Sequence, residues 1–134
     1  MPNPLTLFSV AGKAMSAQLV RMNAAASNLA NAGAVASSEA GAYRPIRAVF
    51  ATELDKASGL ATVNVTGVIR STAAATKEYA PDNPLADADG NVWTAPVDEN
   101  TEMIEMLDAS RQYQNLVEAL STAKQLMLDT MRMK

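Results

Sequence analysis

Residues 25–32 read AASNLANA, and this octet marks the point where a long amphipathic segment ends. Before it, residues recur in alternating steps of three and four, the spacing that lines side chains along one face of a helix. The stripe consists of Phe8, Ala11, Met15, Gln18, Met22, Ala25 and Leu29, and only Gln18 is polar. The alanines of the octet allow another helix to approach closely, whereas its serine and two asparagines offer polar groups where backbone carbonyls lack helical partners.

The limits of this first helix follow from residues that commonly begin and end helices. Asn3 and Pro4 match an N-cap followed by a first-turn proline, and Gly33 matches the glycine that often follows a helix. We therefore expect a helix over residues 4–31, about 40 Å long.

The carboxyl-terminal third carries a second helical pattern. Glu99, Glu102 and Glu105 lie near its start, and Arg132 and Lys134 lie at its end, which complements the helix dipole. Its stripe comprises Met106, Ala109, Tyr113, Leu116, Leu120, Ala123, Met127 and Thr130, and is widened by Met103, Leu107, Val117 and Met131. The pattern predicts a helix over residues 98–134, about 50 Å long, that forms half of a coiled coil or bundle.

The residues between the two helical segments have the character of β-strands. Residues 46–54 and 61–69 are rich in β-branched residues, and residues 56–59 supply a turn, so we expect a β-hairpin. Alternation in the second run stops near Gly67, which indicates a bulge or a strand end. Residues 71–90 contain many Pro, Asp and Asn residues and predict an extended loop, and residues 91–94 predict a last short strand.

These patterns together predict a mainly α fold with a small β insert. The long terminal helices are expected to pair as an antiparallel coiled coil, with residue 31 near residue 100. Residues 1–32 and 98–134 then form one helical domain, and residues 33–97 form a central insert of loops and a short β-hairpin.

The composition excludes most enzyme chemistry. The 134 residues contain no cysteine and no histidine, which removes thiolate nucleophiles, imidazole bases and the commonest metal ligands. The acidic residues are spread over helix starts and loops, so we expect no catalytic residue, no cofactor and no metal site. Asp87, Asp89 and Gly90 recur in calcium loops, but Pro96 would stand where such a loop needs a glutamate, so a turn is the better interpretation.

Charge and hydropathy limit the partners and the location. A net charge of −3 offers no basic surface for nucleic acid. No stretch approaches the roughly 20 apolar residues of a membrane-spanning helix. The amino terminus also lacks the pattern of a cleavable signal peptide, so we expect no cleaved signal.

Several segments resemble the axial proteins of the bacterial flagellum, the family that contains the rod and hook proteins. The octet below a heptad-patterned helix and SRQYQNLVEALSTAKQLMLDTM at residues 110–131 are typical of the class. The segments YRPIRAVF at 43–50, YAPDNPLADADGNV at 79–92 and VDENTEMIEMLDASRQYQ at 97–114 resemble its small proximal-rod members. The resemblance covers nearly the whole chain, and residues 56–78 are its least distinctive part.

The resemblance implies a structural subunit of the basal-body proximal rod, part of the drive shaft that transmits motor torque and supports motility. It implies export through the flagellar type III apparatus and assembly into a helical rod that spans the periplasm. The implied partners are the other proximal rod proteins, the distal rod protein and the adaptor that joins the rod to the membrane ring. The alternative, a soluble coiled-coil adaptor or export chaperone, leaves the PLAD loop at residues 84–87 unexplained.

The expected site is an interface between subunits. Its predicted residues are Asn28, Leu29, Asn31, Met15, Met22, Arg111, Tyr113, Leu116, Leu120 and Met127, and the loop residues that carry the resemblance are Tyr43, Arg44, Pro84, Leu85, Asp87 and Gly90. From helix-end statistics alone, a solvated Asn28 and a capping Asn31 are equally good interpretations; the resemblance favours hydrogen bonds across an interface. Tyr43 with Arg44, and Arg111 with Tyr113, are cation–π or interface pairs, or else a solvated arginine beside a packed tyrosine.

Overall fold

The computed structural model describes residues 4–133, which form two long helices and five strands. In chain order the elements are α1 (Pro4–Ala30), β1 (Val35–Ala36), β2 (Ile46–Asp55), β3 (Leu60–Arg70), β4 (Thr76–Tyr79), β5 (Asn91–Thr94) and α2 (Glu99–Arg132). The predicted helix limits differ from these bounds by two residues at most. The predicted N-cap, Asn3, lies outside the described residues.

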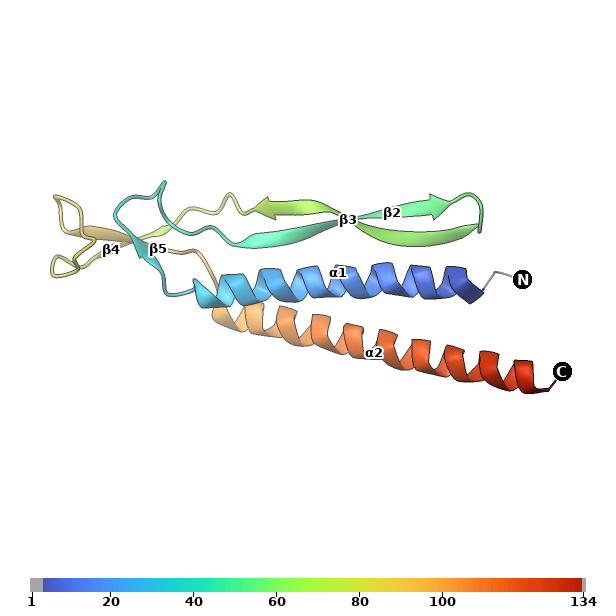
Figure 1. Cartoon of the computed structure of the whole chain (residues 1–134). Helices are drawn as coiled ribbons and strands as arrows, with labels where there is room; N and C mark the ends of the chain where they lie inside the picture. Colours follow the sequence, from blue (N-terminus) through green and yellow to red (C-terminus); the bar gives the residue numbers. More distant parts are fainter. Residues whose placement is uncertain (1–3, 134) are drawn as a thin grey trace.

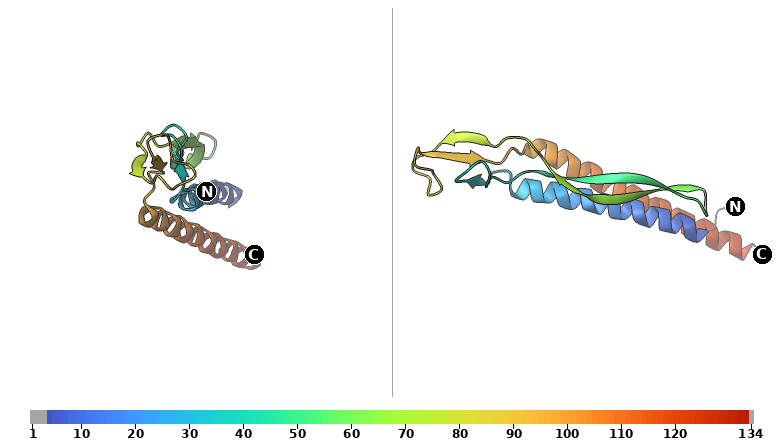
Figure 2. Two further views of the ribbon diagram at one scale, coloured as in Figure 1. Left: turned by 90° about the vertical axis from the view of Figure 1, so that its left-hand side faces the viewer. Right: turned by 90° about the horizontal axis from the view of Figure 1, so that it is seen from above.

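The molecule is elongated, and α1 is its middle layer (Figure 1). The β2–β3 hairpin lies along one side of α1 and α2 lies along the other, and α1 contacts all three elements. The start of α1 and the end of α2 lie at the same end of the molecule, whereas β4 and β5 project at the opposite end, as the two further views also show (Figure 2). The expected combination of two long paired helices with a central β insert is confirmed.

The helices run antiparallel, as ion pairs and hydrogen bonds between them show. Arg21 of α1 binds Glu105 and Asp108 of α2, and Asn28, two turns later in α1, binds Glu102, one turn earlier in α2. The predicted stripe of α2 faces α1: Ala109 is fully buried, and its members from Met106 to Met127 are otherwise half-buried. The residues that widen this stripe are exposed instead, as is Thr130: Met103, Leu107, Val117 and Met131.

The interior is built mainly from alanine. Of the buried apolar residues in the described part of the chain, seven are alanines, and Pro45 and Val92 are the others. Small side chains let α1 approach the layers on both of its sides, but they fill little volume and give few directional contacts. The largest fully buried side chains are accordingly Glu102, Val92 and Asn28, so two of the three are polar.

The hairpin is longer than its sequence pattern predicted and follows α1 for most of its length (Figure 1). Its register runs from Ile46 opposite Arg70 to Asp55 opposite Leu60, and it shifts between Val49 and Phe50, where Thr66 is the extra residue. The loss of alternation near Gly67 therefore marks a bulge and not a strand end.

The hairpin turn is closed by the Asp55 carboxylate. This carboxylate accepts hydrogen bonds from the Ser58 hydroxyl and the Ala57 amide, and these bonds, that of Ser58 first, lower the pKa of Asp55 below its usual value.

The prediction of an extended loop over residues 71–90 was wrong in one part. Residues 76–79 form β4, which pairs with β5, and β1 pairs with the other edge of β5 to give a sheet of order β1-β5-β4. β1 is two residues long, and β4 lies in a stretch whose proline, aspartate and asparagine content indicated a loop, so partners distant in sequence create both strands.

Gly90 shapes the turn between β4 and β5. Its φ of +82° lies in the left-handed region, and a Cβ added there would lie 2.9 Å from Tyr79 Cε2. Both the backbone conformation and the space therefore require glycine.

We expect Gly90→Ala to destabilise the β4–β5 unit by at least about 1–2 kcal/mol, from the left-handed backbone alone. Denaturant unfolding followed by fluorescence of Trp93, the single tryptophan, measures the loss. Gly67→Ala is the matched control, because an added Cβ there meets nothing within 4 Å. Equal midpoints for the two variants would contradict this account of the turn.

Candidate functional site: a polar node that joins three layers

The side chain of Asn28 lies at the centre of a buried hydrogen-bond network. Its carboxamide nitrogen donates to the Ile46 carbonyl at 2.9 Å and to Glu102 Oε2 at 3.0 Å. Its carboxamide oxygen accepts from the Ile46 amide at 2.9 Å and from the Tyr43 hydroxyl at 2.8 Å. An asparagine side chain has two donor hydrogens and two acceptor lone pairs, so Asn28 is fully satisfied.

The pair of bonds between Asn28 and Ile46 has the form of a strand pairing. One residue of a strand presents its N–H and C=O to the same side, and here a side-chain amide fills the place of a neighbouring peptide group. The first residue of β2 is thereby attached to α1, so Asn28 fixes where the hairpin begins along the helix.

Glu102 brings α2 into the same network. It lies in the first turn of α2 and is 2% exposed, yet its carboxylate is compensated by a two-pronged pair with Arg47 of β2. The hydrogen bond to Glu102 is the main cause that raises the pKa of Arg47, and it outweighs the opposite effect of burial. A buried carboxylate without such partners would be strongly unfavourable.

We call these residues, Asn28, Tyr43, Ile46, Arg47 and Glu102, the polar node. Tyr43 is placed by hydroxyl contacts to Asn28 at 2.8 Å and to Ser27 at 3.0 Å. The hairpin and α2 lie on opposite sides of α1, and the Arg47–Glu102 pair reaches from one to the other past the helix. The node therefore connects all three layers at one end of the helix pair.

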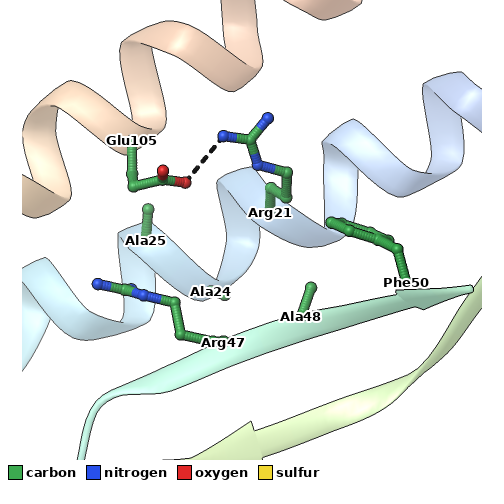
Figure 3. A pocket seen from close by; sticks show the side chains of 7 residues that line it. All are labelled: Arg21, Ala24, Ala25, Arg47, Ala48, Phe50 and Glu105. Atoms are coloured by element: carbon green, nitrogen blue, oxygen red, sulfur yellow. Dashed lines mark hydrogen bonds and ion pairs between the residues drawn. The ribbon is translucent and has the colours of Figure 1, made fainter.

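A second ion-pair cluster lies on the other side of a small cavity (Figure 3). Arg21 donates to Glu105 and Asp108 of α2, both at 3.0 Å. Burial is the largest single influence on the pKa of Arg21 and lowers it, but the hydrogen bonds and charges of the two carboxylates together outweigh burial and raise the pKa. Between Arg21 and Arg47 lies a cavity of about 220 Å³, and Figure 3 shows Ala24, Ala25, Ala48 and Phe50 around it. The small side chains leave space here where bulkier residues would fill it.

The chemistry of this site is structural. No buried side-chain polar atom in the described part of the chain lacks a hydrogen-bond partner, so the node has no spare group to present to a substrate. Residues 4–133 also contain no group of three or more His, Cys, Asp or Glu residues that could hold a metal ion. Over the same residues, neither α1 nor α2 is long and apolar enough to cross a membrane.

Asn28 and Asn31 have roles inside the subunit. Asn28 is 0% exposed, so the solvated interpretation was wrong, and its hydrogen-bonding groups are used within the chain and not across a subunit boundary. Asn31 donates from its side chain to the Ser27 carbonyl at 2.8 Å, which is the capping role expected of an asparagine at a helix end.

The other predicted interface residues lie along the helix pair. Arg111 is exposed, and the remainder are half-buried: Met15, Met22, Leu29, Tyr113, Leu116, Leu120 and Met127. Their contacts with other subunits stay a prediction. Arg44 does not bind Tyr43, since it donates to the Ala73 carbonyl, and the cation–π contact found in the described residues joins Lys77 to Trp93 at 5.8 Å.

Four of the six loop residues of the resemblance lie at the end of the molecule that carries β4 and β5. Pro84, Leu85, Asp87 and Gly90 belong to the connection between these strands, where Asp87 accepts from the backbone amides of Asp89 and Asn91. This confirms the turn interpretation of Asp87–Gly90.

Sequence reasoning missed Glu102 and Arg47. Glu102 was interpreted only through the helix dipole, and Arg47 is one charged residue in an otherwise apolar strand, IRAVF. Opposite charges in two largely apolar segments, such as Glu102 in α2 and Arg47 in β2, are a sign of a buried ion pair. The sequence alone does not show that the two residues face each other.

Comparison with known proteins defines the class. Residues 8–33, which include most of α1, match the family model described as flagella basal body rod protein. Residues 88–133, which include β5 and α2, match the model described as flagellar basal body rod FlgEFG protein C-terminal. The two long helices therefore carry the segments that define structural rod proteins of the flagellar basal body, a class without enzymatic activity.

Full-length comparison narrows the assignment to one family. The chain is 46% identical over 129 residues to the flagellar basal-body rod protein FlgC of Salmonella typhimurium, with 95% of each chain covered. It is 46% identical, with the same coverage, to FlgC of an Escherichia coli strain, and 31% identical over 130 residues to FlgC of Agrobacterium fabrum, with 96% of this chain and 94% of that protein covered. The chain belongs to the FlgC family of basal-body rod proteins, the structural subunits of the proximal rod.

We expect Asn28→Leu to destabilise the subunit by about 3 kcal/mol or more, because Tyr43, Glu102 and both Ile46 backbone groups each lose a partner in a buried site. Thermal or denaturant unfolding measures the effect. Asn23→Leu, at an exposed position of α1, is the matched control and should lie within about 0.5 kcal/mol of the parent. The node would lose its assigned role if both substitutions cost the same.

Proposed function

We propose that the chain works in the proximal rod as a stiff three-layered strut whose α2 helix packs against neighbouring rod subunits. The observation that carries the proposal is a second stripe on α2 that its own chain leaves exposed, apart from the half-buried Ser110. We call it the outer stripe; its residues are Asn100, Met103, Leu107, Ser110, Gln114, Val117, Ser121, Lys124, Leu128 and Met131.

The outer stripe has the spacing of a helix-packing surface. Its members alternate in steps of three and four along 32 residues of α2, as in the stripe that packs against α1. Its apolar members are well exposed: Leu107 is 64% exposed, Met131 is 71% exposed and Val117 is 43% exposed. Exposed apolar residues at helical spacing mark an interaction surface, since burying them is favourable at about 25 cal/mol per Å².

The polar node gives this surface mechanical support. A rod transmits torque only if the layers within each subunit do not slide, and alanine-rich surfaces resist sliding weakly. The node and the Arg21 cluster attach α1 to α2 by charged hydrogen bonds, which hold a fixed geometry better than apolar contacts do. Force applied to the outer stripe would therefore reach the hairpin through α1.

Family membership supports assembly with other rod proteins. We further propose the distal rod protein and the adaptor between rod and membrane ring as neighbours, and the flagellar type III export apparatus as the route of delivery to a rod that spans the periplasm. The interface residues proposed on α2 are Arg111, at the edge of the outer stripe, and Tyr113, Leu116, Leu120 and Met127, between this stripe and α1.

We expect Leu107→Glu to abolish swimming and rod completion while leaving the isolated subunit as stable as the parent, because Leu107 is exposed in the subunit and would be buried in the rod. Soft-agar motility and electron microscopy of purified basal bodies measure assembly. Gln112→Glu adds the same charge at an exposed polar position of α2 outside the outer stripe and should swim normally. Normal motility of the Leu107 variant would overturn the proposal.

A further inference from the structure

We propose that the polar node makes the docking of α2 conditional on the hairpin, so that α2 packs stably on α1 only where β2 already lies on the opposite side of that helix. The inference concerns the order in which the three layers come together. It rests on the contacts of the node and does not use the contacts proposed for the outer stripe.

The α1–hairpin pair satisfies its polar groups without α2. Asn28 makes three of its four hydrogen bonds within this part of the chain, two with the Ile46 backbone and one with the Tyr43 hydroxyl. Only its bond to Glu102 requires α2. The Arg47 side chain is 43% exposed even in the complete fold, so water can hydrate its guanidinium group when α2 is absent. The hairpin can therefore dock on α1 first and leave no buried charge behind.

The α1–α2 pair does not satisfy its polar groups without the hairpin. Glu102 is 2% exposed, and the positive charge that compensates it comes from Arg47 of β2. Without β2 the carboxylate would keep only the hydrogen bond from Asn28, which is a neutral group. Removing one partner of a buried ion pair is strongly destabilising, because the other charge remains buried and uncompensated. Docking of α2 on α1 ahead of the hairpin is thereby unfavourable.

The second ion-pair cluster does not remove this dependence. Arg21 pairs with Glu105 and Asp108, whose side chains are 39% and 49% exposed. Ion pairs that are this open to solvent contribute little, since water and salt screen them. Alanine supplies most of the buried apolar residues and adds little apolar area per residue. The node is therefore the contact that decides whether α2 stays on α1.

The lengths of the connecting segments favour the same order. Asn28 and Ile46 are 18 residues apart in the chain, whereas Asn28 and Glu102 are 74 residues apart. Closing the longer loop costs more conformational entropy. Once β2 and β3 lie on α1, the part of that loop that is still free is shorter, because the hairpin residues are already fixed.

This order makes the node a latch for the outer helix. Until Glu102 reaches Arg47, α2 is held only by alanine contacts and exposed ion pairs, and these allow it to detach from α1 or to change register. Once the pair forms, the hydrogen bonds of Glu102 fix the position of α2 along α1. The latch closes only when all three layers are in place.

Hydrogen exchange of the full-length chain tests the order directly. Trimethylamine N-oxide strengthens the burial of protein surface, so its concentration can be raised stepwise until the layers become protected. Mass spectrometry separates the exchange of residues 46–70 from that of residues 99–132. The amides that bond across the hairpin should become protected at a lower osmolyte concentration than those of α2. Protection of α2 at a lower concentration than the hairpin, or at the same one, would overturn the inference.

Substitutions at the node test whether the buried charge is the cause. Arg47→Met keeps a long apolar side chain without the positive charge, and it should speed the exchange of α2 at least about a hundredfold while the hairpin stays protected. Glu102→Gln keeps an acceptor for Asn28 without the negative charge and should speed exchange less than about tenfold. Added to Arg47→Met, Glu102→Gln should slow the exchange of α2 again at least about tenfold, because no charge is then left buried.

Arg70→Met, at an exposed position of β3, is the matched control and should leave the exchange of both segments unchanged. If Glu102→Gln does not rescue Arg47→Met, the loss comes from the packing of the Arg47 side chain, and conditional docking is wrong. Equal loss of protection in the hairpin and in α2 of the Arg47 variant would show that the layers have no order, which also contradicts the inference.

Discussion

The rest of the fold depends on one side chain, the carboxamide of Asn28. It makes with the Ile46 backbone the two hydrogen bonds that a neighbouring strand would make, and it also donates to the Glu102 carboxylate. In this way a single group in α1 positions both β2 and α2. Removing it would leave a buried carboxylate and two buried backbone groups short of partners, which costs far more than the loss of an average contact. The three layers are therefore not independent, because they meet at this position.

Such a polar centre is a consequence of the alanine-rich interior. Leucine and phenylalanine cores fix the register of two helices by shape, since each large side chain fits only one recess. Alanine surfaces approach closely but resemble one another from turn to turn, so they specify register poorly. Directional bonds between Asn28 and Glu102, and between Arg21 and Glu105, supply the register that packing does not. The fold gains close approach from alanine and alignment from buried polar groups.

The contrast between local patterns and polar bonds over long sequence distances also explains which features could be predicted from the sequence. Helix limits and the hairpin turn follow from local patterns of many residues, and these predictions agree with the structure. β1 has only two residues and β4 lies in a segment with the composition of a loop, and both exist because β5 lies between them, so only tertiary structure reveals them. Asn28 was recognised as unusual, but its partner Glu102 lies 74 residues away in the chain, and Arg47, the partner of Glu102, lies 19 residues away; no local rule connects the three.

The position of α1 also determines which surface is left for other molecules. A helix in the middle layer uses both of its sides within the chain, whereas an outer helix uses one, and α2 is the outer helix. Its second stripe has no counterpart in the described part of the chain, and its exposure is therefore a property of the topology rather than of a few residues. A subunit built on this plan must complete its packing with another molecule, and the helix that needs the partner is the one farthest from the hairpin.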